Sequence, residues 1–520
     1  MDTLRITRIL TGTATGILLG VLSGCAPSIT QQTPTELPPT ISSTATEALV
    51  VPAITDTVHP HPVTRTPLPS RPAPVITPFT DATLPFQAFP VAEGQFIALV
   101  NGRVIDGTGA PAHLGWTVLI QGTRILAAGP DVELPAGTRV VDLAGQTLLP
   151  GMFDMHGHLY AYNGHNLTFE SVAYPRLYLA GGVTTIFTAG ELDPEGAFVL
   201  RESIDNGRAV GPQILTAGPY FSGGNAASWM LKARNTEDML ALYNQWSPRI
   251  DGVKFYTRIP EDQFKVVLDA AHADGLVVTG HLESISGMRA IELGIDGLEH
   301  GLFGMSEFFP KGTSFATQYC AISKLDVTSA PVVGMVDALV QHGTYLDPTI
   351  VVFQPELPDF EPLVKDWEKY LDESVRNSIR REIQSMVQGE CLQIALEKQA
   401  QFVRAVHDRG GLIVTGTDPV IPILLPGYSM HRELENLVAA GLSPLEAIQA
   451  ATLNAATAIR LDSQKGSIAA GKIADLVVVD GNPDMDITAI GNTVMVFKNG
   501  VPYVPQLLRK SVEGLIGKEQ

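Results

Sequence analysis

The sequence predicts an α/β protein, a (β/α)8 TIM-like barrel joined to a small β-sandwich domain built from both ends of the chain. Three observations predict it. Over about 300 residues, short apolar runs alternate with helical stretches, the pattern of βα units in a parallel barrel. Short strands with Asn-Gly turns lie on both sides of this region. Histidines and an aspartate close several apolar runs, and active-site residues gather at such strand ends.

The β-sandwich domain is predicted to cover residues 94–150 and 461–505. Residues 96–105 have the pattern of a hairpin, in which an apolar run, an Asn-Gly turn and a second strand follow one another. The same style recurs near the other end of the chain, so the two ends are expected to pair in one domain. Further strands are expected at 116–120, 124–128, 474–480 and 494–500.

The barrel is predicted to cover residues 151–460, followed by a C-terminal tail at 506–520. The charged stretch 361–409 has apolar residues at helical spacing and is longer than one βα helix requires. We interpret it as helices with an insertion that could cover the mouth of the barrel. Barrel strands are expected at 183–189, 214–217, 252–256, 277–281, 297–300, 344–351 and 412–417.

Residues 1–25 are predicted to be a lipoprotein signal peptide. Arg5 and Arg8 precede an apolar stretch that is too short to span a bilayer, which is typical of an export signal. The stretch ends in Leu-Ser-Gly-Cys25, which resembles the lipobox of bacterial lipoproteins. The resemblance implies an extracytoplasmic protein anchored to a membrane by a lipid on Cys25. The alternative is an ordinary signal peptide that contains a cysteine.

Residues 26–93 are rich in proline and threonine and are predicted to be a disordered linker. Such a segment can act as a spacer between the membrane and a folded domain. His59 and His61 lie inside it and imitate a ligand pair, but prolines flank them and the segment offers no further ligands. We interpret them as residues of the linker rather than as a metal site.

The charge and the cysteines exclude two classes of protein. A formal net charge of −19 repels a polyanion, so nucleic acid is not an expected partner. Three cysteines are too few for a disulfide scaffold and have no spacing typical of structural zinc. Cys320 and Cys391 could pair in an oxidising compartment or could remain buried thiols. The sequence predicts no oligomeric state.

The strongest local signal for chemistry is His156 and His158. At positions i and i+2 of a strand, two imidazoles point to the same side and can bind one metal ion. His281, His300 and Asp418 each close another apolar run. Because the C-terminal ends of barrel strands share one rim, four histidines and a carboxylate are expected to converge there.

Lys254 alternates with apolar residues in the run 252–256, and Tyr256 shares its side of the strand. A protonated lysine repels a metal ion and is costly to bury without a partner. The alternative is a lysine at the rim whose amine reaches solvent.

Taken together, these features resemble the amidohydrolase superfamily, and within it the members with a binuclear metal centre. The group related to prolidases and imidazolonepropionases is most similar. The resemblance covers about residues 96 to 504. It rests on Pro150-Gly151 before the two histidines, on the order Lys254, His281, His300 and Asp418, and on the runs 181–185, 451–456 and 466–477.

The resemblance implies a centre with two divalent metal ions, for which zinc is the expected ion. His156, His158 and Asp418 would hold the more buried metal, and His281 and His300 the more exposed one. Lys254, carboxylated by CO2, would bridge the two metals as an anion, which removes the physical objection to a lysine there.

The implied reaction is hydrolysis of an amide-type C–N bond in a small substrate: a dipeptide, an N-acyl amino acid or a cyclic amide. A metal-bridged hydroxide would attack, and Asp418 would act as general acid and base. Tyr256 and His165 are weaker candidates for substrate contacts. The alternatives are a mononuclear enzyme, imidazolonepropionase-like or deaminase-like, and a non-catalytic binding lipoprotein.

Overall fold

The computed structural model describes residues 83–386 and 389–518. The predicted signal peptide, Cys25, His59 and His61 lie outside the described residues. Within the described ranges, no helix is both long and apolar enough to cross a membrane.

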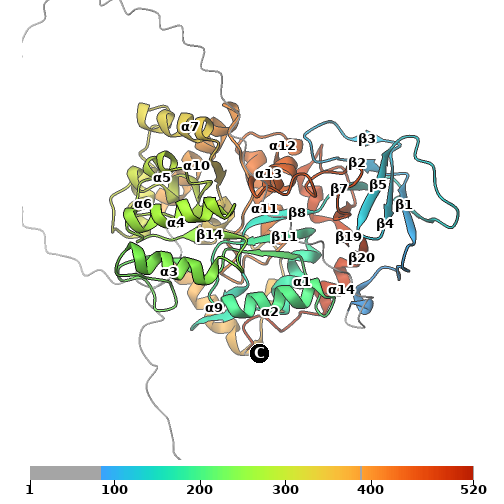
Figure 1. The fold of residues 1–520 in the computed structure, drawn as a ribbon, viewed down its shortest axis with the longest axis horizontal. Coiled ribbons are helices and arrows are strands. Elements are labelled where there is room, and N and C mark those ends of the chain that lie inside the picture. The colour runs from blue at the N-terminus through green and yellow to red at the C-terminus, as the bar shows by residue number, and fades with distance from the viewer. Residues whose placement is uncertain (1–82, 387–388, 519–520) are drawn as a thin grey trace, which may run out of the picture. The chain divides into compact units, whose positions relative to one another are not determined.

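Two parallel sheets form the α/β region (Figure 1). Their strand orders are β12–β11–β8 and β13–β14–β15–β16–β17. Five predicted runs, at 183–189, 214–217, 252–256, 277–281 and 297–300, agree with observed strands to within one residue at each end. The α/β class is therefore confirmed. The strands are β8 (Met152–Gly157), β11 (Val183–Thr188), β12 (Gln213–Thr216), β13 (Tyr220–Phe221), β14 (Gly252–Phe255), β15 (Val277–Gly280), β16 (Gly297–Glu299) and β17 (Tyr345–Asp347).

Backbone hydrogen bonds join the two sheets at both sides. On one side, the amide of Asp251, just before β14, donates to the carbonyl of Thr216 in β12 at 2.7 Å. On the other side, residues 412–418 lie between β17 and β8: Leu346 donates to Leu412, and Met155 donates to Thr415, each at 2.8 Å. Backbone hydrogen bonds therefore connect the strands of the two sheets and residues 412–418 in a continuous ring.

Two predicted strands differ from the observed ones. The run at 412–417 forms only one bridge, between Ile413 and Leu346, because its later residues also bond to a side chain of β8. The run at 344–351 ends at Asp347. Pro348 has no amide hydrogen to donate, and Thr349 has a left-handed backbone with φ 41°, so the strand stops and α8 (Ile350–Phe353) begins.

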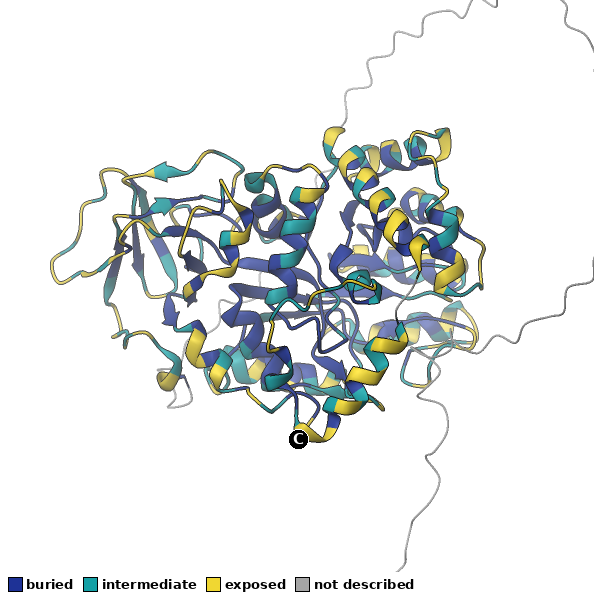
Figure 2. Cartoon of the chain, turned by 180° about the vertical axis from the view of Figure 1, so that it is seen from behind, coloured by how far each residue is buried: buried dark blue, intermediate teal, exposed yellow. Residues whose placement is uncertain are grey.

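Amphipathic helices cover the strands. In α4, the buried residues recur at helical spacing and include Phe264, Val267, Leu268 and Ala271. Figure 2 shows strands that are buried along most of their length, beside helices with exposed outward faces. The longer helices of this region are α1 (Ala173–Ala180), α2 (Pro194–Asp205), α3 (Thr236–Trp246), α4 (Glu261–Ala273), α7 (Ala330–His342), α10 (Glu390–Asp408) and α11 (Tyr428–Ala439).

Two further sheets bring the two ends of the described chain together. One has the order β5–β4–β1–β6 and the other β20–β19–β18–β7–β2–β3. β7 (Thr147–Pro150) pairs antiparallel with β18 (Leu476–Val479), so residues more than 300 positions apart are neighbours. Buried side chains of both sheets share one cluster, which includes Ile97 and Val118 from the first and Val478 from the second. The other strands are β1 (Phe96–Val100), β2 (Arg103–Val104), β3 (His113–Leu114), β4 (Thr117–Gln121), β5 (Arg124–Gly129), β6 (Arg139–Asp142), β19 (Thr493–Lys498) and β20 (Val501–Tyr503).

The predicted hairpin at 96–105 is wrong. β1 pairs with β4 and β6, whereas β2 pairs with β3 and β7, so the chain crosses between sheets at Asn101-Gly102. A Cβ at Gly102 would lie 2.7 Å from Cδ1 of Leu143. Close packing at the crossing therefore requires this glycine, and the Asn-Gly pair marks a change of sheet rather than a two-residue turn.

The predicted end of the linker at residue 93 is also wrong. Residues 83–93 begin with a short 3-10 helix, η2 (Leu84–Phe86), and Ala88 donates a backbone hydrogen bond to Pro502 at 2.9 Å. The guanidinium of Arg139 lies 3.9 Å from the ring centroid of Phe89. Aromatic residues within a Pro/Thr-rich composition thus attach this stretch to the folded chain.

The C-terminal tail folds onto the α/β region. It contains α14 (Pro505–Lys510), which lies against α1, and a fully buried Ile516. The amide of Gly517 donates to Oε1 of Glu170 at 2.7 Å.

The stretch 361–409 forms α9 (Glu373–Met386) and α10. Cys320, in α6 (Phe315–Ile322), and Cys391, in α10, form a disulfide. The alternative of two buried free thiols is therefore excluded.

Candidate metal centre

His156 lies near the end of β8, and His158 directly follows this strand. Each is only 2% exposed, and their ring centroids are 5.3 Å apart. Nδ1 of His158 lies 3.2 Å from the carbonyl of Gly190, and the hydroxyl of Tyr178 bonds both the amide and the carbonyl of His158. These contacts turn Nε2 of His158 toward Asp418, whose Oδ1 is 2.9 Å away.

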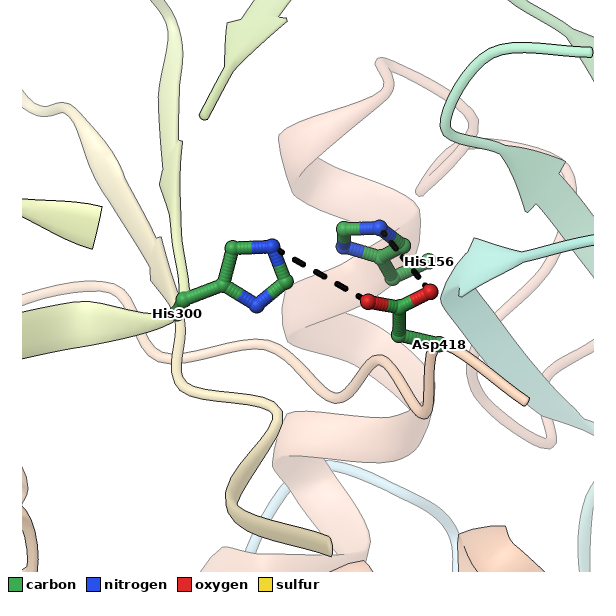
Figure 3. A group of neighbouring side chains, drawn as sticks. All are labelled: His156, His300 and Asp418. Carbon is green, nitrogen blue, oxygen red and sulfur yellow. Dashed lines mark ion pairs between the residues drawn. The ribbon is translucent and has the colours of Figure 1, made fainter. Parts of the chain in front are cut away.

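The carboxylate of Asp418 faces two imidazoles, with one oxygen toward His156 and the other toward His300 (Figure 3). Nε2 of His156 is 3.8 Å from Oδ1, and Nε2 of His300 is 4.0 Å from Oδ2. Burial alone would raise the pKa of Asp418, but the charge interaction with His156 and the hydrogen bond from His158 outweigh it and hold that pKa well below its ordinary value. Asp418 is therefore ionised at neutral pH.

His300 and His281 follow β16 and β15 directly. Their ring centroids are 4.5 Å apart, and the ring of His300 is 4.9 Å from that of His156. Burial lowers the pKa of His281 well below 6.5 and that of His300 to about 4. Neutral imidazole is the form that binds metal ions.

Three residues at strand ends adopt left-handed backbone conformations. These are His300 (φ 63°), Thr349 (φ 41°) and Asp418 (φ 47°). Non-glycine residues rarely adopt such angles, and those that do cluster at functional sites. Backbone hydrogen bonds hold two of them. The amide of His300 donates to the carbonyl of Asp347 at 2.7 Å, and the amide of Asp418 donates to the carbonyl of His156 at 2.8 Å.

The donor set fits a divalent metal ion. Three possible ligand atoms lie within 4.8 Å of one another, one from each of His156, His300 and Asp418. Two imidazole nitrogens and a carboxylate oxygen are donors that zinc and related ions accept, and His158 lies close enough to Asp418 to add a third nitrogen.

Lys254 is buried beside this group and is not a rim lysine. It is 1% exposed, its amine forms an ion pair with Glu299, and it lies 6.0 Å from the ring centroid of Tyr256. Burial lowers the pKa of Lys254 to about 7. A substantial fraction of the amine is therefore neutral near pH 7.

Three buried acidic residues beside the histidines were not predicted. Asp154 accepts hydrogen bonds from the amides of His156 and Thr417, each at 3.1 Å, and so joins β8 to residues 412–418. Glu299 precedes His300, and Asp347 ends β17. The sequence contains a pattern that could have identified them, because acidic residues, like histidines, are unusual at the ends of apolar runs.

The two weaker substrate candidates lie in different surroundings. The ring of Tyr256 is 5.4 Å from that of His281 and 5.2 Å from that of Tyr220, so it borders the centre. His165 is exposed, and its Nε2 lies 3.3 Å from Oγ of Ser378 in α9. The structure brings Tyr256 to the centre, whereas the side chain of His165 contacts Ser378 in α9.

These features make the strand ends of this α/β protein a candidate site for a metal ion. Residues 147–502 match the model of the Amidohydrolase family. Because the match covers more than half of the sequence, the chain belongs to the amidohydrolase family.

Curated relatives by sequence include adenine deaminases. The chain is 23% identical over 413 residues to "Adenine deaminase 3" of Rhizobium meliloti (strain 1021), covering 77% of this chain and 55% of that protein. It is 23% identical over 436 residues to an adenine deaminase of Halalkalibacterium halodurans, and the match covers 80% of this chain and 59% of that protein. The chain thus spans little more than half the length of these relatives.

Solved structures with the same fold include proteins described as prolidases. A putative prolidase from Bifidobacterium longum superposes with a TM-score of 0.61 at 23% identity, covering 81% of this chain and all of that one. A Xaa-Pro dipeptidase with bound methionine superposes with a TM-score of 0.59 at 23% identity, and the match covers 79% of this chain and 100% of that one. At such identities, the likeness shows the fold.

Proposed function

We propose that the chain is a metal-dependent hydrolase of an amide-type C–N bond in a small substrate such as a dipeptide, an N-acyl amino acid or a cyclic amide. The observation that carries the proposal is the convergence of buried imidazoles on the carboxylate of Asp418 at the strand ends. Family membership and the dipeptidase named among the structural neighbours support it.

The proposal assigns the ring of strands to a closed (β/α)8 barrel, with residues 412–418 as its eighth strand. The two outer sheets then form a composite β-sandwich domain from residues 94–150 and 461–505. The shared core of those sheets and the bonds at both sides of the ring support these assignments.

In this proposal, His156, His158 and Asp418 would hold one divalent ion, and His281 and His300 would hold a second. A bound divalent ion lowers the pKa of water to about 7 and polarises the carbonyl of the substrate. Asp418 would take up at its carboxylate the proton that the attacking water loses as its oxygen bonds to the carbonyl carbon. It would then pass this proton to the leaving nitrogen as the C–N bond breaks, a role worth about 10² to 10⁴ in rate. Tyr256, at the border of the centre, can donate a hydrogen bond to the substrate.

Carboxylation of Lys254 belongs to the proposal as well. The neutral amine is the form that reacts with CO2, and burial makes that form accessible near pH 7. In the structure the amine is paired with Glu299, so the carbamate would replace this ion pair.

Export, and anchoring through a lipid on Cys25, stay predictions. The disulfide between Cys320 and Cys391 supports an oxidising compartment.

The substrate class is tested with the purified chain, stripped of metal and reloaded with zinc. We expect the reloaded chain to release amino acids from dipeptides or N-acyl amino acids, and the stripped chain to be inactive. Asp418→Asn serves as the inactive control at equal protein concentration. No hydrolysis of any dipeptide, N-acyl amino acid or cyclic amide by the zinc-loaded chain would contradict the proposal.

A deaminase is the second candidate, because the sequence relatives are named adenine deaminases. Adenine added to the same assay distinguishes the two, since deamination releases ammonia and leaves no free amino acid. Ammonia release from adenine, without peptide hydrolysis, would replace the first candidate by the second.

A further inference from the structure

The ring nitrogens that face away from the proposed metal differ among the histidines of the centre. Nδ1 of His158 lies 3.2 Å from the carbonyl of Gly190, and Nδ1 of His300 lies 2.7 Å from Oγ1 of Thr349. In each case an oxygen can hold the ring and select which nitrogen carries the proton. Nδ1 of His156 is buried and has no hydrogen-bond partner among the described residues.

Two carboxylates lie near this nitrogen. Oδ2 of Asp347 is 3.7 Å from Nδ1 of His156, and Oε2 of Glu299 is 3.8 Å from it. In the structure both oxygens of Glu299 are engaged, because Oε2 pairs with Lys254 and Oε1 accepts a hydrogen bond from Thr279 at 3.1 Å. Carboxylation of Lys254 would release Oε2, but Oε1 would keep its bond to Thr279. Within the described residues, neither carboxylate oxygen of Asp347 has a hydrogen-bond partner. A fully buried carboxyl and a buried imidazole nitrogen thus face each other, each lacking a partner.

Packing keeps these two groups together. A Cβ at Gly416 would lie 2.2 Å from Oδ2 of Asp347 and 2.5 Å from Cβ of His156. The absent side chain of Gly416 therefore provides the space in which the carboxyl approaches the imidazole. The gap of 3.7 Å exceeds the longest ordinary hydrogen bond by about 0.5 Å.

We propose that Asp347 is a positioning residue for His156. Its carboxyl group accepts a hydrogen bond from Nδ1–H of His156, which leaves Nε2, the nitrogen that faces Asp418, free to bind the metal. This inference rests on the proposed metal centre and deepens it, because it assigns the buried acidic residue at the end of β17 to metal affinity rather than to bond cleavage.

Zinc affinity tests the assignment without any substrate. The metal-free chain is titrated with zinc against a chromophoric chelator, for the wild type, Asp347→Asn and a matched control, Glu170→Gln. We expect Asp347→Asn to bind zinc about 10- to 100-fold more weakly, the range found when a partner of a ligating histidine is removed. Glu170, a buried carboxyl bonded to Gly517, should have no such effect when changed to Gln.

A double-mutant cycle separates positioning from a general structural effect. In a His156→Ala background, Asp347→Asn should cause no further loss of zinc affinity, because the ring on which it acts is absent. An equal loss in both backgrounds would overturn the inference, as would unchanged affinity in the single variant. If the wild type binds no zinc, the proposed function fails together with this inference. That result differs from the two above, in which the wild type binds zinc and only the role of Asp347 is overturned.

The wild type supplies a second measurement should Asp347→Asn not fold. In the zinc-loaded chain with ¹⁵N-labelled histidine, long-range ¹H–¹⁵N correlation identifies the protonated nitrogen of each ring. Loss of a signal in His156→Ala assigns that residue. We expect the proton of His156 on Nδ1; a proton on Nε2 would overturn the inference.

Discussion

At the scale of single residues, the proposed function gives Asp418 two roles, those of metal ligand and proton carrier. Its carboxylate lies 2.9 Å from Nε2 of His158 and 3.8 Å from Nε2 of His156. A left-handed backbone and a bond from its amide to the carbonyl of His156 hold it there. The residue can therefore bind a metal and still present an oxygen to a proton.

Asp418→Asn tests this double role. The amide keeps the shape of the side chain and one oxygen, but it cannot take up a proton near neutral pH. We expect kcat to fall by about 10² to 10⁴ while the variant retains much of its metal. Steady-state kinetics and elemental analysis on the same sample measure both quantities, and an unchanged kcat would exclude Asp418 as the proton carrier.

Glu170 gives the stability of the fold a pH dependence. Burial raises its pKa from 4.5 to about 8, so the folded chain binds a proton that the unfolded chain releases between these values. This contribution to stability is present below about pH 4.5 and is lost as pH rises to about 8. Glu170→Gln should therefore raise Tm at pH 8 relative to the wild type and leave it little changed at pH 4.5. Thermal melts at the two pH values measure the difference; an equal shift at both would contradict the assignment.

The four histidines and Asp418 could be singled out from the sequence because they lie at the ends of apolar runs. The contacts of the buried acidic residues could not be predicted, since nothing in the sequence shows that Glu299 meets Lys254 or that Asp347 meets His156. Such pairs depend on side-chain packing across strands, which strand periodicity does not specify.

At the scale of elements, the disulfide connects the insertion to the centre. It joins α6 to α10, and from α10 the side chain of Gln399 donates to the carbonyl of His300 at 3.1 Å and accepts from the amide of Leu302 at 2.8 Å. The cross-link therefore restrains the helix that holds the backbone beside His300.

Removing the disulfide should lower stability. The two cysteines are 71 residues apart, and a loop of this length corresponds to about 4 kcal/mol in the chain-entropy model. We expect the double variant Cys320→Ser/Cys391→Ser to unfold at lower denaturant concentration than the wild type. Reductant should bring the wild type to the level of the variant and leave the variant unchanged. If reductant did not change the denaturant concentration at which the wild type unfolds, the disulfide would contribute nothing to stability.

Local sequence patterns predicted most strands but not every partner. Asn101-Gly102 has the composition of a hairpin turn, yet close packing of Gly102 against Leu143 marks a crossing between sheets. The Pro/Thr-rich composition concealed Phe86 and Phe89, which attach residues 83–93 to the fold. In both cases contacts distant in sequence override the local signal.

At the scale of the whole molecule, alternating βα units were enough to predict the α/β class, because apolar runs of strand length separated by amphipathic helices have few other solutions. The joining of residues before 150 and after 476 was expected from their similar strand style, and β7 and β18 do pair. The number of metal ions depends on Lys254, which pairs with Glu299 as an amine and would bridge two ions as a carbamate.

The most direct test of the account is therefore the metal content of the chain. A chain that begins at residue 83 is expressed in bicarbonate-containing medium with added zinc, and metal per chain is measured by elemental analysis for the wild type and Lys254→Ala. The account predicts about two metal ions per wild-type chain and fewer in the variant. A wild type that retains no metal, or about one ion that Lys254→Ala leaves in place, would contradict it.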